Sequence, residues 1–261
     1  MRLRLALAVF LIFCQSMVYG QSTMAGVTLS ADEIMQKVDE QLLYLKGLTK
    51  LQLTITSNKG AVRVYKATLF KKQEDSLFIF DTLGRGRILR LLYNDQGKTI
   101  YAYSMLDKRL YEKRAGDRFD AVLNSGFYFF DLSNSPFSEN FVPKISGREK
   151  KDGNDWLRIE NIPLDRGKYS RLNVLVDNKD NFKVKRIDYY DSAGVLMKSM
   201  LVKHDKIPVK QARKQTVSKA YATKLEMMDM SKGTISILEF LLNDKTAKLD
   251  SSLFRRENIE K

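Results

Sequence analysis

The chain has almost no cysteine or histidine. Cys14 is its only cysteine and His204 its only histidine in 261 residues. Disulfides, cysteine metal sites and thiol nucleophiles after position 14 are therefore excluded. A lone histidine is more often a surface residue than a catalyst, and no G-x-S-x-G or H-E-x-x-H motif is present. We expect no enzyme activity, no metal and no cofactor, although the many carboxylates leave a paired-carboxylate hydrolase open.

Long apolar runs are also missing beyond the N-terminus. Arg2 and Arg4 precede the apolar stretch 5–13, which is shorter than the roughly 20 residues of a transmembrane helix. This pattern is typical of a secretory signal peptide cleaved after Gly20. We therefore expect residues 1–20 to be removed and residues 21–261 to form a single exported domain. Lipidation of Cys14 is a weaker alternative, because bulky Phe13 stands where a small residue is preferred.

Acidic residues are outnumbered by basic ones, and the formal net charge is +14. Such a surface suits an anionic partner, such as a membrane surface or an acidic protein, although it can also serve solubility alone. Export argues against a nucleic-acid partner.

Two short helices are predicted. Ser30 and Glu33 form a capping box ahead of apolar residues at helical spacing, so a helix is expected over 30–45, with Gly47 as its stop. A second helix is expected over 117–125, where Asp117 is the cap and Phe119 and Leu123 are on the buried face.

The rest of the chain is dominated by alternating apolar and polar residues between short polar turns. This pattern predicts a mainly β protein with short helices (α+β), built as an antiparallel meander of about 11 strands. The expected strand segments are 51–57, 62–72, 76–83, 86–95, 98–105, 108–114, 141–150, 155–163, 170–178, 182–191 and 194–207, with two more within 214–229 and 234–242. A sheet of this size tends to curl, and the two helices are the only cover for its apolar face.

The stretch Gly84-Arg85-Gly86-Arg87 looks like a phosphate-binding loop. Such a loop leads into a helix and, in the Walker pattern, carries Lys-Ser/Thr. Here "ILRLLYND" follows, which is typical of a strand. The glycines therefore indicate a kink or bulge between strands.

Apolar and aromatic residues gather on one side of the predicted strands. They either pack an ordinary core or line a ligand cavity that two short helices leave unfilled. We expect this concave face to be a lipid-binding groove. Its predicted residues are Leu53, Ile55, Leu69, Leu89, Leu91, Tyr101, Tyr103 and Val174.

The order of motifs resembles the LolA-like outer-membrane lipoprotein-sorting proteins. The resemblance is carried by Arg85-Gly86 entering a strand, the "IYAY" and "KRLYEK" strands, Ser125-Gly126 and Asp131-Leu132. The tail "LDSSLFRRENIE" is similar to the terminal segment of the family. The lid arginine of the well-studied carriers is not assigned to any one position of this chain, and the charge of this chain is more basic.

The resemblance implies an unclosed β-barrel covered by a helical lid, in a periplasmic protein. It implies a carrier that takes acyl chains of lipoproteins or lipids from an inner-membrane exporter to an outer-membrane acceptor, with transient contact to the membrane surface. Lid residues are then expected at Phe119, Leu123, Phe127 and Phe129. For Arg85 and Arg87 a plain solvated edge is favoured over contact with anionic headgroups at the rim. The alternative is a non-catalytic envelope sensor or scaffold with the same fold and a filled core.

Overall fold

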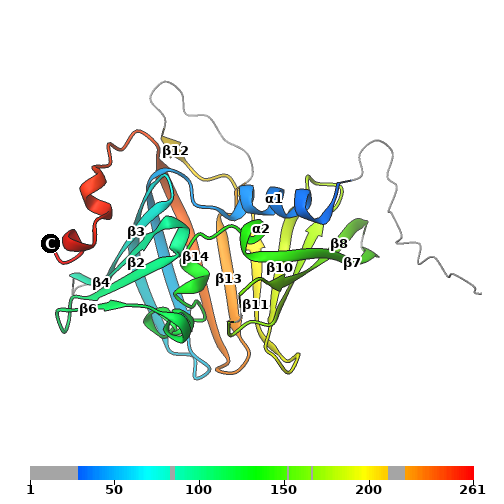
Figure 1. Cartoon of the computed structure of the whole chain (residues 1–261), viewed down its shortest axis with the longest axis horizontal. Coiled ribbons are helices and arrows are strands. Elements are labelled where there is room, and N and C mark those ends of the chain that lie inside the picture. Colours follow the sequence, from blue (N-terminus) through cyan, green and yellow to red (C-terminus); the bar gives the residue numbers. More distant parts are fainter. Residues whose placement is uncertain (1–28, 83–85, 152, 166, 211–220) are drawn as a thin grey trace, which may run out of the picture.

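The computed structural model describes residues 29–82, 86–151, 153–165, 167–210 and 221–261. Within these residues the chain forms one curved sheet with two α-helices (Figure 1). The helices are α1 (Ala31–Leu42) and α2 (Phe137–Asn140). The strands are β1 (Gly47–Thr56), β2 (Val62–Lys72), β3 (Asp75–Thr82), β4 (Gly86–Asn94), β5 (Thr99–Ser104), β6 (Arg109–Glu112), β7 (Phe141–Lys151), β8 (Asn154–Pro163), β9 (Arg171–Asp177), β10 (Lys183–Tyr190), β11 (Leu196–Lys203), β12 (Val209–Lys210), β13 (Lys224–Asp229) and β14 (Thr234–Asp244).

The sheet is unclosed. Its strands are hydrogen-bonded in the order β6-β5-β4-β3-β2-β1-β14-β13-β11-β10-β9-β8-β7, and the two-residue β12 pairs with β14. Every described pair is antiparallel except β12 with β14. The predicted mainly β, open-barrel architecture is confirmed. The described residues form 14 strands, so the predicted count of about 11 was low. The 13 segments expected from the sequence each overlap one strand, and only the two-residue β12 lies outside them, because so short a pairing has no periodicity that a sequence could reveal.

Helix α1 begins as predicted and ends earlier. The Ser30 side chain accepts the Glu33 amide at 3.2 Å, and the Glu33 carboxylate accepts the Ser30 amide at 2.7 Å. The helix ends at Leu42, and Gly47 instead opens β1 with φ +103°. A Cβ at position 47 would stand 2.3 Å from the Asp244 carbonyl oxygen, so glycine allows β1 to approach β14. The prediction of Gly47 as a helix stop was therefore wrong.

The concave face of the sheet is filled by residues 119–141, which we call the plug. Val122, Phe127 and Leu132 of the plug are at most 1% exposed and belong to the same core as Leu53 and Val174 of the sheet. The Gly126 amide donates to the Ser236 hydroxyl at 2.8 Å, which ties the plug to β14. The plug therefore occupies the space that the sequence left open for a cavity.

The predicted helix over 117–125 is not present. Two 3₁₀ turns, η2 (Ala115–Phe119) and η3 (Val122–Asn124), stand in its place, and Leu123 adopts a positive φ of 53°. The Val122 amide bonds the Phe127 carbonyl and the Phe129 amide bonds the Asp120 carbonyl, at 2.9 and 3.1 Å. These cross-links make the segment a tight hairpin-like loop, which a continuous helix would break.

The convex face carries a second, smaller core. Residues 245–261, which we call the C-terminal segment, lie along this face (Figure 1). Phe254 and Ile259 pack on Leu77 and Leu92 of the sheet. The Arg90 guanidinium donates to the Ile259 carbonyl at 2.7 Å, and Lys72 donates to the Leu249 carbonyl at 3.1 Å. Apolar residues therefore occur on both faces of β3 to β5.

The glycine-rich stretch is described only from Gly86 onward, and β3 ends before it at Thr82. β4 begins at Gly86, pairs with β3 and shifts register between Phe80 and Asp81, which is a bulge. Gly84 and Arg85 lie outside the described residues, as do Cys14 and the expected cleavage site at Gly20. No helix among the described residues has the length and apolarity needed to span a bilayer.

Candidate functional site

A cleft of about 970 Å³ lies where the sheet fails to close. On one side it is lined by η2 and the turn between β4 and β5, and on the other by α2 and the connection from β8 to β9. Its apolar lining includes Phe119, Phe130, Phe141 and Leu164. Ligand pockets in proteins commonly span roughly 300–1,000 Å³ and are mainly apolar. The cleft is therefore large enough for a small amphipathic molecule.

Aromatic rings form the inner wall of the cleft. The Phe119 ring stands 5.3 Å from Phe130 and 5.5 Å from Tyr169, and Tyr128 stacks on Tyr169 at 5.9 Å. Gly167 permits this packing, because a Cβ there would lie 2.7 Å from the Phe119 ring. The aromatic residues that line the cleft are Phe119, Phe130, Phe141 and Tyr169, whereas Tyr128 packs on Tyr169 without lining it. Three of these four lining residues belong to the plug, so the inner wall of the cleft is mainly the outer surface of the plug.

A buried ion pair lies between the sheet and the plug, next to the aromatic residues of the cleft. The Lys198 ammonium on β11 contacts the Asp131 carboxylate at 3.2 Å, with side chains 0% and 4% exposed. Asp131 also accepts the Tyr169 hydroxyl and the Tyr128 amide, both at 2.7 Å. Lys198 lies 2.7 Å from the centre of the Tyr128 ring. Because the ammonium is buried, the pKa of Lys198 falls to about 8.

A small inner pocket of about 60 Å³ lies under α1 and α2. It shares Phe130, Ser135, Asn140 and Phe141 with the cleft, so these residues separate the two spaces. The Asp39 carboxylate of α1 accepts the Phe137 and Ser138 amides at 2.7 and 2.9 Å, which holds α2 in place. Burial raises the pKa of this Asp39 carboxyl, and the two amide bonds oppose that effect.

Most predicted groove residues lie deep in the core. Leu53, Ile55, Leu69, Leu91 and Val174 are at most 1% exposed, and Leu89 packs against the same core. None of them lines the cleft. They share the concave face, as the alternation predicts, but the plug and α1 cover them. A ligand reaches these residues only if the plug moves.

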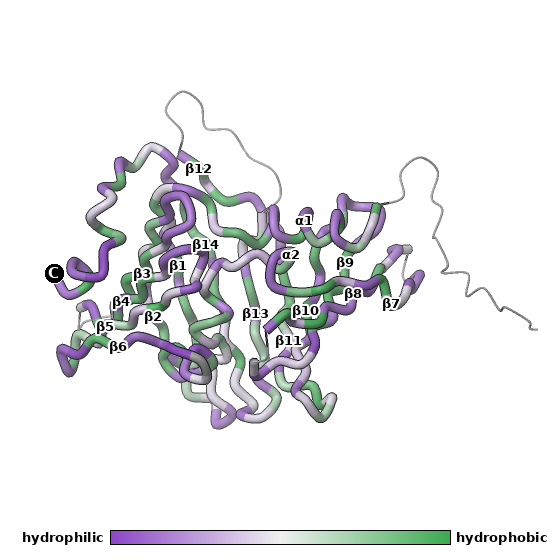
Figure 2. Tube along the Cα trace, viewed as in Figure 1, coloured by the Kyte–Doolittle hydropathy of each residue, from purple (hydrophilic) through white to green (hydrophobic). Residues whose placement is uncertain are grey.

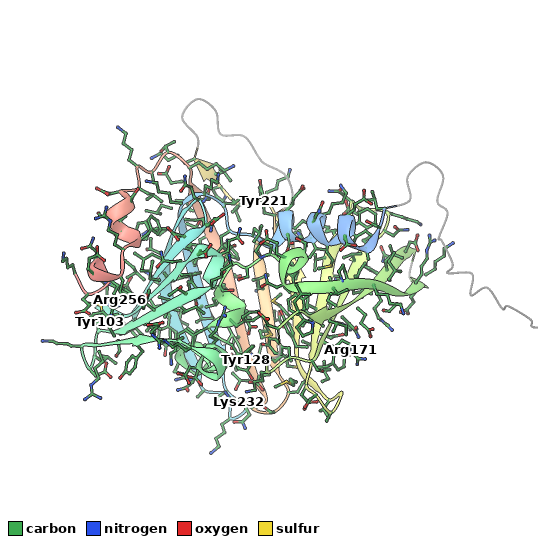
Figure 3. All side chains as sticks on the ribbon, viewed as in Figure 1. Tyr103, Tyr128, Arg171, Tyr221, Lys232 and Arg256 are labelled. Atoms are coloured by element: carbon green, nitrogen blue, oxygen red, sulfur yellow. The ribbon has the colours of Figure 1, made fainter. Side chains whose placement is uncertain are left out.

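Tyr101 and Tyr103 were assigned to the wrong face. Tyr101 is the cross-strand partner of Leu92, and Tyr103 that of Arg90, so both point to the convex side. They pack in the second core with the C-terminal segment. The Arg256 guanidinium of that segment lies 5.7 Å from the centre of the Tyr101 ring. In Figure 3, Tyr103 and Arg256 are on the same side of the molecule, whereas Tyr128 lies between the two halves of the sheet. Neither tyrosine belongs to the concave groove.

The predicted lid residues divide between the cleft and the core. Phe119 lines the cleft. Phe127 and Phe129 are 1% and 7% exposed inside the core, and Leu123 packs against it. Arg87 is exposed on β4 and does not line the cleft. His204 lies with its Nε2 at 2.8 Å from the Val184 carbonyl, a structural contact between β10 and the end of β11.

Several site residues could not be selected from the sequence. In the sequence, Lys198 is one of several polar residues in an alternating strand, and Arg118 is one of many basic residues. Nothing local distinguishes either residue. Leu164 follows Pro163, outside any alternating segment, so no periodicity in the sequence marks it as a site residue. The Asp131-Leu132 pair was noted as a motif, but its contact with a lysine 67 positions away depends on the tertiary structure.

Solved structures that align with this chain include a LolA superfamily protein and a lipoprotein-sorting domain. A LolA superfamily protein from Nitrosomonas europaea aligns with a TM-score of 0.68 and 18% identity, covering 88% of this chain and 99% of that one. A Vibrio parahaemolyticus domain, provisionally named for outer membrane lipoprotein sorting, aligns with a TM-score of 0.72 and 18% identity, covering 88% and 98%. At this identity the likeness establishes the fold. Comparison with curated proteins gave no significant sequence match.

One family model covers most of the chain. Its description reads "-like: Uncharacterized protein", and it matches residues 72–261, which run from the end of β2 through the plug, the cleft and the C-terminal segment. The predicted resemblance to LolA-like proteins is confirmed at the level of the fold. The chain belongs to the family described as "-like: Uncharacterized protein", and it has the unclosed-barrel fold of the LolA superfamily.

Proposed function

We propose that this protein is a non-enzymatic, exported carrier that binds acyl chains of lipids or lipoproteins and moves them through the periplasm toward the outer membrane. The observation that carries the proposal is the cleft of about 970 Å³ at the gap in the sheet, with phenylalanine rings as its inner wall. The fold shared with lipoprotein-sorting structures supports it. A carrier of this kind needs no covalent step.

The acyl chain is expected to enter beside Phe119 and Leu164. Each methylene moved from water into an apolar site contributes about 0.8 kcal/mol. A longer chain would displace the plug and reach Leu91, Leu53 and the rest of the predicted groove. Part of the binding energy would then be spent on moving the plug, so release to an acceptor needs only a site of higher affinity. An inner-membrane exporter and an outer-membrane acceptor are the partners that such a carrier requires.

A filled core favours the second candidate, a sensor or scaffold of the cell envelope. The plug buries Val122, Phe127 and Leu132 against the sheet, and the inner pocket is only about 60 Å³. In this alternative the concave face never opens and the cleft binds no acyl chain. The two functions therefore differ in one measurable property, which is acyl binding.

The test is a titration of the purified protein with a fluorescent fatty acid, together with mass spectrometry of co-purifying lipids. Leu164→Asn should weaken probe binding. Leu106→Asn is a matched control, because Leu164 and Leu106 are 63% and 79% exposed but only Leu164 lines the cleft. Absence of both probe binding and bound lipid would reject the carrier and leave the scaffold. N-terminal sequencing of exported protein tests cleavage near Gly20.

A further inference from the structure

Arg118 is set apart from the other charged residues of the cleft. It comes from η2, lines the cleft and is half-buried, whereas Lys98, Asp120, Glu139, Asp165 and Lys168 are exposed. Its Nη2 donates to the Gly97 carbonyl at 2.7 Å, and its guanidinium lies 5.5 Å from the centre of the Phe130 ring. The carbonyl bond and the ring hold the guanidinium in place at the apolar wall.

The charges around Arg118 leave it without a bound carboxylate. Asp120 forms an ion pair with Lys113 at 3.0 Å, and Lys98 forms one with Asp95 at 3.4 Å. Asp165 is near enough to favour the charged guanidinium, but it forms no ion pair with Arg118 within the described part of the chain. The Nε of Arg118 is buried and has no hydrogen-bond partner there. One donor of the guanidinium is therefore buried beside the cleft and unsatisfied.

An unsatisfied, partly desolvated guanidinium is costly. Burial lowers the pKa of Arg118, which means that its surroundings disfavour the charge. Arginine remains charged all the same, and its planar donors match the oxygens of carboxylate and phosphate groups. An anion bound to the remaining donors of the guanidinium would supply both a hydrogen bond and the missing charge partner. A neutral headgroup would supply only a hydrogen bond.

We infer that the cleft takes an amphipathic ligand with an anionic oxygen headgroup, carboxylate or phosphate, and that Arg118 binds this headgroup while Phe119 and Leu164 contact the acyl chain. This inference rests on the proposed function and narrows it to acidic lipids. Arg118 is then the residue that makes the cleft bind an acidic lipid more tightly than a neutral lipid of equal chain length.

The experiment compares cis-parinaric acid with its methyl ester, which share one fluorescent chain and differ in charge. The wild type should bind the acid about tenfold more tightly, the effect of one charge-assisted hydrogen bond. Arg118→Gln should abolish this preference, because the affinity for the acid falls to about that for the ester. Lys98→Gln removes the same charge from an exposed cleft residue already paired with Asp95, and should retain the preference.

Laurate and a short-chain phosphatidic acid serve as competitors, with diacylglycerol as the neutral comparison. Displacement of the acid probe by either anionic competitor supports the inference and identifies the headgroup. Equal displacement by diacylglycerol overturns it, as does equal binding of acid and ester by the wild type. The ratio of the wild-type affinities for the acid and the ester tests the preference for an anionic headgroup even if Arg118→Gln fails to fold. If neither probe binds, the proposed function itself fails.

Discussion

Lys198 and Asp131 form an ion pair in the interior of the sheet, with the ammonium 3.2 Å from the carboxylate and both side chains at most 4% exposed. The pair joins β11 to the plug through η4 (Phe130–Leu132), the turn that contains Asp131. Two hydrogen bonds from Tyr169 and Tyr128 to Asp131 complete the arrangement. The ion pair therefore links the plug to the sheet through a buried polar contact.

Breaking this pair from one side should destabilise the protein strongly. Asp131→Asn or Lys198→Met leaves a buried charge without its partner, which costs about 3–5 kcal/mol. The double variant Asp131→Leu with Lys198→Met should recover much of the loss, since no charge remains buried. Denaturant unfolding measures each value. Single variants as stable as wild type would contradict the buried pair.

The pH dependence of stability should carry the signature of Lys198. Its pKa is lowered by burial from 10.5 to about 8 in the folded protein. Between these values the unfolded chain binds more protons, so the contribution of Lys198 to stability rises with pH from about 8 to 10.5. Below that window the full cost of the buried charge is present.

The measurement is the unfolding free energy of wild type minus that of Lys198→Met, followed across this pH window. Lys71, whose pKa also falls to about 8 by burial, is present in both proteins and cancels. The difference should increase with pH. A difference that stays flat would show that Lys198 has an ordinary pKa in the folded state.

The concave face can be tested by charge insertion on β1. Leu53 is 1% exposed, so Leu53→Asp places an unpaired carboxylate in the core and should cost several kcal/mol. Gln52→Asp is the matched control, because Gln52 lies on the opposite side of the same strand and is only half-buried. Thermal unfolding of the two variants should differ clearly. Equal melting temperatures would mean that the face is assigned backwards.

Stability and acyl binding should separate at Tyr103. Tyr103 packs under the C-terminal segment on the convex face, so Tyr103→Ala should lower stability by about 3–5 kcal/mol, as for other large core aromatics. Affinity for a fluorescent fatty acid should not change. The comparison is Phe119→Ala, which removes part of the cleft wall and should weaken that affinity. If Tyr103→Ala loses affinity for the fatty acid, Tyr103 belongs to the binding groove and its assignment to the convex face is wrong.

Gly47 should tolerate no side chain. Gly47→Ala adds a Cβ that meets the Asp244 carbonyl at 2.3 Å, in addition to the strain of φ +103°. Gly60→Ala is the control, because its φ of +79° is strained too but nothing lies within 4 Å. Gly60→Ala should cost on the order of 1 kcal/mol and Gly47→Ala clearly more. Equal unfolding free energies would show that β1 can shift away from β14.

The sequence by itself determined the local elements, because their causes are local. Ser30 and Glu33 are three residues apart, and their capping box sets the start of α1 wherever the helix packs. The alternation of Leu51, Leu53 and Ile55 requires one shared face in any β1, which the structure confirms. Figure 2 shows this alternation of apolar and polar residues along the strands. The mainly β class follows from many such segments, whereas the unclosed barrel was implied by the resemblance of the motifs to LolA-like proteins.

Only the tertiary structure decided which face of each strand is concave and what fills it. Leu92 and Leu91 are both buried, and the register that pairs Leu92 with Tyr101 determines that Tyr101 belongs to the convex core. Alternation cannot reveal this, because the C-terminal segment makes both faces of β4 apolar. The plug and the pairing of Lys198 with Asp131 likewise depend on contacts between residues distant in sequence, whose energies no local pattern encodes.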